Sequence, residues 1–224
     1  MSDTLLECIE IETGPQPTHA VIWLHGLGAD GHDFAPIVPE LGLANRPAVR
    51  FVFPHASVRP VTINSGMSMR AWYDIYHPAV VPREDEQGLR ASEQALRALI
   101  ARENERGIPT ANIVLAGFSQ GCAMVLQTGL RLEEKLAGMI GLSGYLPLAG
   151  RVPAERHAAN QQTPIFLAHG TMDPVVAFDR ARASCQALLD MGYPVEWKTY
   201  PMPHSVCGQE IADISIFLRT VLAG

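Results

Sequence analysis

The sequence contains few cysteines and no pattern that would pair them. Cys8, Cys122, Cys185 and Cys207 lie far apart, with no CxxC pair and no metal-type spacing of Cys and His. Disulfide-stapled secreted domains and structural zinc sites depend on such closely spaced pairs. We therefore expect reduced thiols in a cytoplasmic protein, and neither a disulfide framework nor a metal site of that kind.

Long apolar runs and basic clusters are also missing. No uninterrupted apolar run reaches the roughly 18 residues that a membrane-spanning helix needs. The opening MSDTLLECIEIE carries acidic residues where a signal peptide has a basic stretch. The 17 Lys and Arg are scattered over a chain of net charge -6, which argues against a nucleic-acid surface. We expect neither a membrane span nor a nucleic-acid partner.

The chain does have enough apolar material to form a core. Hydrophobic residues make up 47% of its 224 residues and charged residues only 18%, so a disordered chain is excluded. Most domains contain about 100 to 200 residues. We therefore expect a single globular domain that spans residues 1–224.

Short apolar runs alternate with amphipathic stretches along the chain. The runs are rich in branched residues and predict strands at residues 20–24, 49–53, 112–116, 139–142, 164–168 and 195–200. The stretches have apolar residues three and four apart and predict helices at about residues 32–41, 87–105, 120–132, 178–191 and 208–222. This alternation predicts the α/β class, with a mostly parallel sheet covered by helices on both faces. Functional groups then gather beyond the carboxyl ends of the strands, and the aperiodic residues 54–85 are expected to form a wall of the active site.

A GxSxG pattern follows one of the predicted strands directly. Gly117 to Gly121 read GFSQG, after the run NIVLA and before the helix-compatible CAMVLQTGL. A tight strand-to-helix turn needs small neighbours and presents the serine hydroxyl above the sheet edge. The start of the helix also favours developing negative charge. We interpret Ser119 as a nucleophile, and the alternative is an ordinary turn serine.

A serine nucleophile needs a histidine base, which in this fold comes late in the chain. The late histidines are His157, His169 and His204, and only His204 follows all the predicted strands. It lies in the loop PMPHS, which the two prolines restrict in conformation. We predict His204 as the base, and expect of His169 a hydrogen bond within a loop.

The third member of such a triad is an acid between the serine and the histidine. Asp173 comes just after a predicted strand, in HGTMDPVV, and the following Pro174 disfavours a helix there. Asp179 and Asp190 fall on a predicted helix, where a solvated charge is the simpler interpretation, and Asp213 follows His204. We predict Asp173 as the acid that orients the base.

The reaction intermediate of such an enzyme carries an oxyanion that needs two backbone donors. One is expected from the residue after the nucleophile, Gln120, and the other from a loop after an early strand. Residues 25–28 read HGLG after the run AVIWL, and the Leu27 amide is the preferred second donor. The alternative is a plain glycine-rich turn, in which His25 makes a structural hydrogen bond.

An acyl pocket for an ester substrate must be apolar. Five apolar residues lie in loops that this fold brings near Ser119, and we interpret them as candidates for the pocket: Met67, Trp72, Leu146, Val176 and Val206. Each of them is about as consistent with ordinary core or loop packing.

Taken together, several blocks of the sequence resemble one known family. The blocks are HGLGADGHDF, RPVTINSGMSMRAWYDI, AGFSQGCAM, LSGYLPL, HGTMDPVV and YPMPHSV. They resemble the bacterial carboxylesterases related to acyl-protein thioesterases, in the phospholipase/carboxylesterase group, over about residues 20–220. The resemblance implies a single-domain α/β-hydrolase without cap domain, cofactor or metal, and it supports Ser119, Asp173 and His204 as triad with Leu27 and Gln120 as oxyanion donors. Relatives often form dimers, so a homodimer is a further expectation.

The resemblance also suggests what the protein acts on. It implies a serine carboxylesterase that cleaves esters of short to medium acyl chains. The alternatives are an acyl-protein thioesterase or a lysophospholipase, and more remotely an α/β-hydrolase that binds a hydrophobic ligand without catalysis. One residue departs from the family pattern: relatives often have a second glycine at the position of Cys122, so the larger side chain is expected to tighten helix-to-strand packing.

Overall fold

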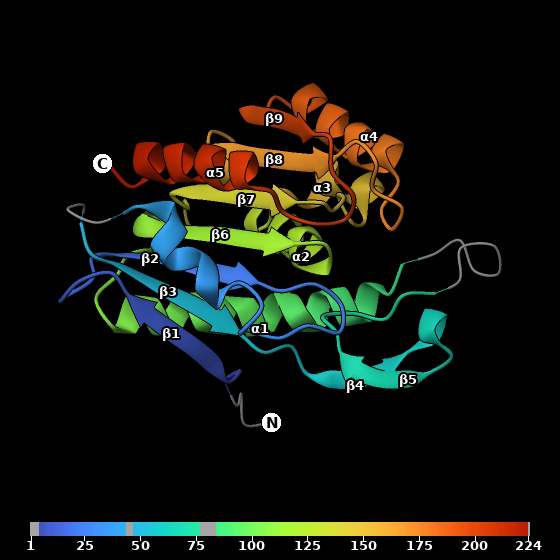
Figure 1. Ribbon diagram of the computed structural model, residues 1–224, viewed down its shortest axis with the longest axis horizontal. Coiled ribbons are helices and arrows are strands. Elements are labelled where there is room, and N and C mark those ends of the chain that lie inside the picture. Colours follow the sequence, from blue (N-terminus) through green and yellow to red (C-terminus); the bar gives the residue numbers. More distant parts are fainter. Residues whose placement is uncertain (1–4, 44–46, 77–83, 224) are drawn as a thin grey trace.

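A seven-stranded sheet forms the centre of the molecule (Figure 1). The computed structural model describes residues 5–43, 47–76 and 84–223. The strand order is β1-β3-β2-β6-β7-β8-β9, and β1 alone runs antiparallel to its neighbour. The strands span Cys8–Glu12 (β1), His19–Leu24 (β2), Val49–Pro54 (β3), Ile113–Phe118 (β6), Gly138–Leu142 (β7), Ile165–Gly170 (β8) and Val195–Tyr200 (β9).

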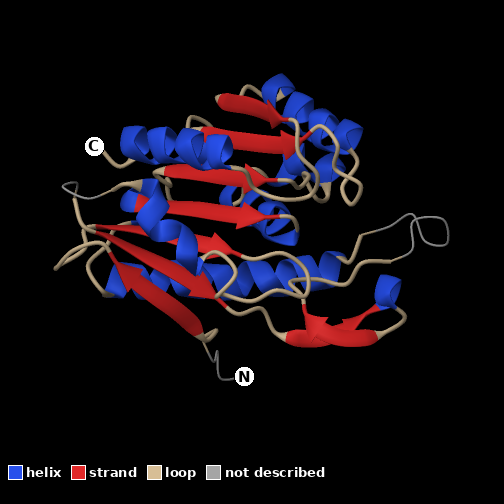
Figure 2. Cartoon of the chain, viewed as in Figure 1, coloured by secondary structure: helices blue, strands red, loops and turns tan. Residues whose placement is uncertain are grey.

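Helices cover both faces of this sheet (Figure 2). They span Glu86–Glu105 (α1), Gln120–Gly129 (α2), Val152–Glu155 (α3), Phe178–Asp190 (α4) and Gly208–Val221 (α5). Side chains of β2 alternate between two buried clusters: Ala20, Ile22 and Leu24 pack in one, and Val21 and Trp23 in the other. The first cluster includes residues of α1, α2 and α4, and the second includes residues of α5. A strand that is buried on both faces has a continuous run of apolar residues, and this run allowed β2 to be predicted from the sequence.

All six strands predicted from the sequence are present, while one predicted helix has a different form. Residues 35–41 make a 3-10 helix, Ala35–Leu41, instead of an α-helix over 32–41. Pro36 and Pro39 explain the difference, because proline has no amide hydrogen to donate within the helix. The edge strand β1 was not predicted, because its five residues alternate charged and apolar side chains over too short a run.

The predicted active-site wall contains a small sheet of its own. Strands Val58–Val61 (β4) and Met67–Arg70 (β5) pair antiparallel, apart from the central sheet. Figure 1 shows this pair on the side toward which the parallel strands point. The turn between them contains Ser65 and Gly66, both with positive φ angles of 57° and 74°. Residues 77–83 of the expected wall lie outside the described part of the chain.

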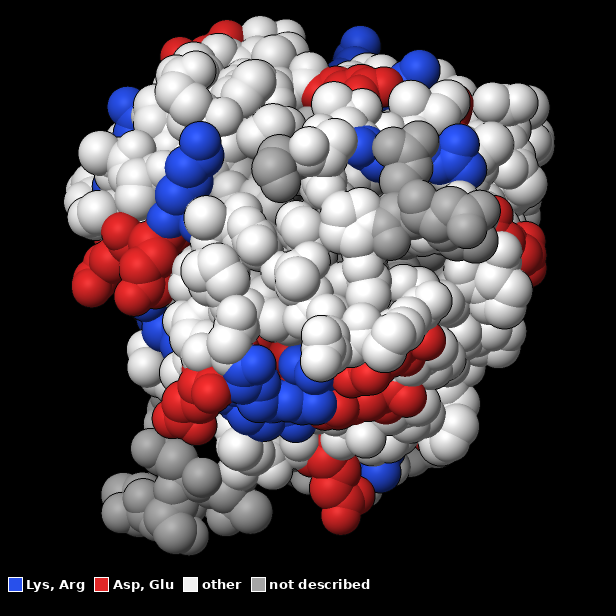
Figure 3. Space-filling model, turned by 90° about the vertical axis from the view of Figure 1, so that its left-hand side faces the viewer, with Lys and Arg blue, Asp and Glu red and all other residues white. Residues whose placement is uncertain are grey.

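Charged groups of both signs lie next to one another on the face where the parallel strands begin (Figure 3). Ion pairs of this kind include Arg106 with Glu10, whose atoms are 2.8 Å apart. A buried pair joins Arg50 of β3 to Glu103 of α1 at 2.8 Å. Among the described residues, no helix is long and apolar enough to cross a membrane.

Candidate active site

Ser119 stands between the end of β6 and the start of α2, in a strained backbone conformation. Its φ and ψ angles are 56° and -115°, a combination that non-glycine residues rarely adopt. A side chain at Gly117 would clash with the backbone of Gly121, and one at Gly121 with the carbonyl oxygen of Leu24. The Ser119 amide donates to the Leu142 carbonyl at 2.8 Å. The two glycines of the GxSxG pattern therefore allow the turn that presents the hydroxyl at the carboxyl edge of the sheet.

His204 reaches this hydroxyl from the loop that follows β9. Its Nε2 lies 3.0 Å from Oγ of Ser119, and its Nδ1 lies 2.6 Å from Oδ2 of Asp173. A carboxylate only accepts hydrogen bonds, so Nδ1 carries the hydrogen and Nε2 is free to accept the serine proton. The His204 ring also packs on Phe118, with ring centroids 4.7 Å apart.

Asp173 is held in its ionised form in the loop after β8. Its Oδ1 accepts the amides of Val175 and Val176 at 2.8 and 2.9 Å. Burial of Asp173 opposes ionisation, but the hydrogen bonds from His204 and the two amides outweigh it and lower the pKa of this carboxyl below its usual value. The acid can therefore orient His204 and stabilise a positive charge on it.

His169 lies behind Asp173 and makes the loop contact expected of it. Its Nε2 donates to the carbonyl of Val176 at 2.9 Å and lies 3.4 Å from Oδ2 of Asp173. Burial lowers the pKa of His169, so the ring stays neutral near neutral pH. His169 thus braces the loop that carries the acid.

The amides of Leu27 and Gln120 lie beside Ser119 without a protein acceptor. Both residues line the same cavity as Ser119, and within the described chain neither amide donates to another group. Two hydrogen bonds hold the loop that carries Leu27. The Gly28 amide donates to the Arg70 carbonyl at 2.9 Å, and the Ala56 amide donates to Nε2 of His25 at 3.0 Å. Two free amides on rigid supports suit an oxyanion.

The Gln120 side chain has a structural role that the sequence did not indicate. Its Oε1 accepts the Trp72 amide at 3.0 Å, and its Nε2 donates to the Tyr73 carbonyl at 2.9 Å. The indole of Trp72 donates to the carbonyl of His25 at 2.9 Å. These bonds join the nucleophile turn, the wall and the loop after β2 into one support.

A cavity of about 950 Å³ opens beside Ser119 and His204. Of the five apolar residues expected to line it, the lining contains Val176. Trp72 and Leu146 are buried in the core beneath the cavity, and Val206 packs on the cluster at the other face. Met67 is 65% exposed on β5. Loop membership alone did not reveal in which direction these four side chains point.

Part of the cavity lining is polar, and no motif in the sequence indicated this. The hydroxyls of Tyr73 and Tyr145 lie 2.7 Å apart, and the Arg180 guanidinium lies 3.3 Å from the centroid of the Tyr145 ring. Burial raises the pKa of both tyrosines, so both stay neutral. Glu84 lies 3.6 Å from Arg180. These residues come from three separate segments, and no local pattern connects them.

The chain is similar to known proteins over most of its length. The sequence profile of the phospholipase/carboxylesterase family matches residues 6–222. Acyl-protein thioesterase 1 of Yarrowia lipolytica is 41% identical over 207 residues, covering 90% of this chain and 91% of that protein. Acyl-protein thioesterase 1 of Neurospora crassa is 43% identical over 212 residues, covering 90% and 86%. The crystal structure of Arabidopsis thaliana SOBER1 matches with a TM-score of 0.85 at 31% identity, covering 91% of this chain and 99% of that one.

These relatives confirm part of what the sequence predicted and correct another part. The α/β-hydrolase fold with a mostly parallel sheet is confirmed. The narrower resemblance to bacterial carboxylesterases is not supported by these relatives, which come from fungi and a plant.

Proposed function

Since the chain belongs to the phospholipase/carboxylesterase family of ester-hydrolysing serine hydrolases, we propose that it is an acyl-protein thioesterase with Ser119, His204 and Asp173 as its catalytic triad. The observation that carries the triad is the alignment of three side chains, with contacts of 3.0 and 2.6 Å. The names of the fungal relatives favour the thioesterase over the short-chain carboxylesterase that the sequence suggested first.

Acylation begins when Oγ of Ser119 attacks the carbonyl carbon of the acyl group. The hydroxyl proton passes to Nε2 of His204, and the Asp173 carboxylate stabilises the resulting imidazolium. The amides of Leu27 and Gln120 donate to the oxygen that becomes negative. When the carbon–sulfur bond breaks, His204 returns the proton to the leaving thiolate and an acyl-serine ester remains.

Deacylation repeats these steps with water as nucleophile. His204 takes a proton from a water molecule whose oxygen attacks the acyl-serine carbonyl, and the same two amides hold the oxyanion. The bond to Oγ breaks, the proton returns to Ser119, and a free carboxylic acid leaves. An oxygen ester follows the same route and differs only in its leaving group.

Covalent labelling tests the proposed nucleophile directly. A fluorophosphonate probe followed by peptide mass spectrometry should modify Ser119 of the wild-type protein. Ser119→Ala should take up no probe and lose at least about 10⁴-fold in kcat. Ser68→Ala is the matched control, because Ser68 is an exposed serine on β5. Labelling of another serine at an equal rate in the Ser119→Ala protein would contradict the proposal.

Parallel substrate series separate the thioesterase from a carboxylesterase. We expect kcat/KM to be higher for an acyl thioester than for the oxygen ester of the same acid, because a thiolate is the better leaving group and the relatives share this activity by name. Within each series we expect the highest kcat/KM at intermediate acyl length. Higher values for the oxygen esters throughout would favour the carboxylesterase, and a steady rise to palmitoyl would contradict the expected length optimum.

A further inference from the structure

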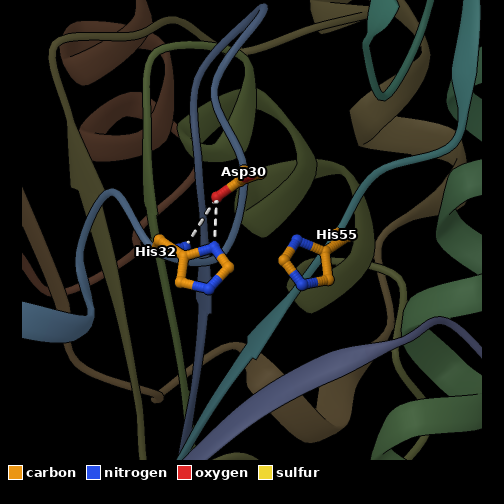
Figure 4. A group of neighbouring side chains, drawn as sticks. All are labelled: Asp30, His32 and His55. Atoms are coloured by element: carbon orange, nitrogen blue, oxygen red, sulfur yellow. Dashed lines mark hydrogen bonds and ion pairs between the residues drawn. The ribbon is translucent and has the colours of Figure 1, made fainter.

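A second cluster of ligating side chains lies outside the catalytic cavity. Asp30 and His32 belong to the loop after β2, and His55 follows β3 directly. Figure 4 shows the two imidazole rings facing each other, with the Asp30 carboxylate next to them. One nitrogen or oxygen atom from each residue lies within 4.8 Å of the other two. None of these three side chains belongs to the triad or lines the catalytic cavity.

We propose that Asp30, His32 and His55 form a binding site for a divalent transition-metal ion of the Zn²⁺ class. Two imidazole nitrogens and one carboxylate oxygen are a ligand set that zinc accepts, with water in the remaining position. The site is open to solvent on one side, because the side chains of His32 and Asp30 are 75% and 40% exposed. An incoming ion therefore needs no passage through the core and can keep a water ligand.

Side-chain movement would bring the three ligand atoms to the spacing that zinc requires. Tetrahedral zinc with ligand bonds of about 2.0 to 2.1 Å places its ligand atoms roughly 3.3 Å apart. Oδ1 of Asp30 and Nδ1 of His32 are 2.9 Å apart and share a hydrogen, which the ion would replace after a small widening. The ligand atom of His55 lies at most 4.8 Å from the other two. The exposed His32 side chain, whose ring centroid lies 5.5 Å from that of His55, can move to close the remaining gap.

The chemistry of the three donors suits a cation. A carboxylate offers a negatively charged oxygen, and each neutral imidazole offers one unprotonated nitrogen. Oδ1 of Asp30 accepts the amide of His32 at 2.8 Å and lies 2.9 Å from Nδ1 of the same residue, so the carboxylate faces the His32 ring.

Metal binding at His55 would reach the loop that carries Leu27. Nδ1 of His55 has its lone pair unprotonated, because it accepts the Gly31 amide at 3.1 Å. An ion that binds this nitrogen displaces the Gly31 amide and so removes one of the hydrogen bonds that hold residues 25–31 in place. If the proposed oxyanion role of Leu27 holds, the ion slows hydrolysis by loosening this loop.

Calorimetric titration of the untagged, chelator-treated protein with zinc chloride tests the site without any measurement of activity. We expect one strong equivalent in the wild-type protein and at least a tenfold weaker Kd in His32→Ala and in Asp30→Asn. Asn at position 30 keeps the oxygen that accepts the His32 amide, so this variant removes charge and spares the turn. His157→Gln, a histidine outside the cluster, is the control with unchanged binding. Equal Kd values in wild type, His32→Ala and Asp30→Asn would overturn the proposal, as would no binding below about 100 µM zinc.

The effect on hydrolysis is measured as the ratio of rates without and with saturating zinc. We expect this ratio to be at least fivefold larger for wild type than for His32→Ala. Both proteins keep the triad and the partly exposed thiols of Cys8 and Cys207, so zinc bound there inhibits both equally. Equal ratios together with weakened binding in His32→Ala would overturn the coupling to the loop. Failure of the triad proposal would instead appear as probe labelling at a serine other than Ser119.

Discussion

Asp173 and His169 show how neighbouring side chains fix protonation at the scale of single residues. Asp173 accepts three hydrogen bonds, from His204, Val175 and Val176, and stays ionised despite burial. His169 lies next to the same carboxylate, but its Nε2 donates its hydrogen bond to the backbone carbonyl of Val176. The contacts of His204 thus suit the proton transfer proposed for it, and those of His169 suit support of the loop.

Replacing Asp173 by Asn tests this division of roles. The Asn amide can present its NH₂ group to Nδ1 of His204, which would then place the ring hydrogen on Nε2, where it cannot accept the Ser119 proton. We expect kcat to fall by about 10³ to 10⁴-fold with little change in KM. Steady-state kinetics with a soluble thioester substrate measures both constants. Asp179→Asn, an exposed acid on α4, should keep full activity. A loss below tenfold in Asp173→Asn would contradict the role given to this acid.

Cys122, where the family resemblance led us to expect glycine, lies three residues after Ser119 and is buried. A side chain at Gly141 or Gly144 would meet its sulfur at 2.7 or 2.6 Å, so the thiol occupies the space that these two glycines leave. This agrees with tight packing between α2 and β7. Burial raises the pKa of Cys122 to about 12, so the thiol stays protonated and does not compete with Ser119 as nucleophile.

Ser119, His204 and Asp173 could be selected from the sequence because a local motif and a fixed chain order restrict the choice. The lining of the cavity could not be selected in this way. Trp72 turns inward because its indole finds an acceptor at His25, and Arg180 faces the cavity because Tyr145 and Glu84 attract it. Contacts between distant segments decide both orientations, and sequence patterns describe only neighbours.

At the scale of elements, the junction of β6, α2 and β2 depends on the absence of side chains. Gly121 of α2 lies so close to β2 that a methyl group would overlap the Leu24 carbonyl. Strands β2, β6 and β8 were predictable because each is an almost continuous buried run. The β4–β5 pair was not, since each of its strands has only four residues and two of these four are exposed.

Alanine at position 121 should therefore destabilise the protein. The added methyl has no room, so β2 and α2 must separate, at a cost of about 2 to 4 kcal/mol in the free energy of unfolding. Urea unfolding followed by circular dichroism measures this change. Gly208→Ala at the start of α5 is the matched control, because nothing lies within 4 Å of its added atom and the cost there should be below about 0.5 kcal/mol. Equal stability of the two variants would contradict the close contact.

At the scale of the whole molecule, the pH dependence of folding stability involves a buried acid that is not part of the triad. Glu210 in the first turn of α5 is fully buried, and this burial raises its pKa to about 8 from a usual value of 4.5. At pH values between 4.5 and 8, the Glu210 carboxyl therefore keeps its proton in the folded protein but has lost it in the unfolded chain. Its contribution to stability is complete below about pH 4.5 and is lost as the pH rises toward 8.

Glu210→Gln should remove this pH dependence. Relative to wild type, we expect the variant to gain about 2 to 5 kcal/mol in the free energy of unfolding between pH 5 and pH 8.5, measured by urea titration at both values. Glu196→Gln on β9, an exposed acid, should follow the wild type at each pH. A constant difference between Glu210→Gln and wild type would show that the carboxyl does not titrate in this range.

The position of β9 at the margin of the sheet has a consequence for how the enzyme fails on heating. Within the described part of the chain, β9 pairs only with β8. Most of its side chains are not fully buried, and His204 lies in the loop that follows it. Amide hydrogens of such a margin exchange with solvent sooner than those of the centre. Catalysis should therefore disappear some degrees below the melting of the interior, and reappear on cooling as long as β2, β6 and β7 have stayed intact.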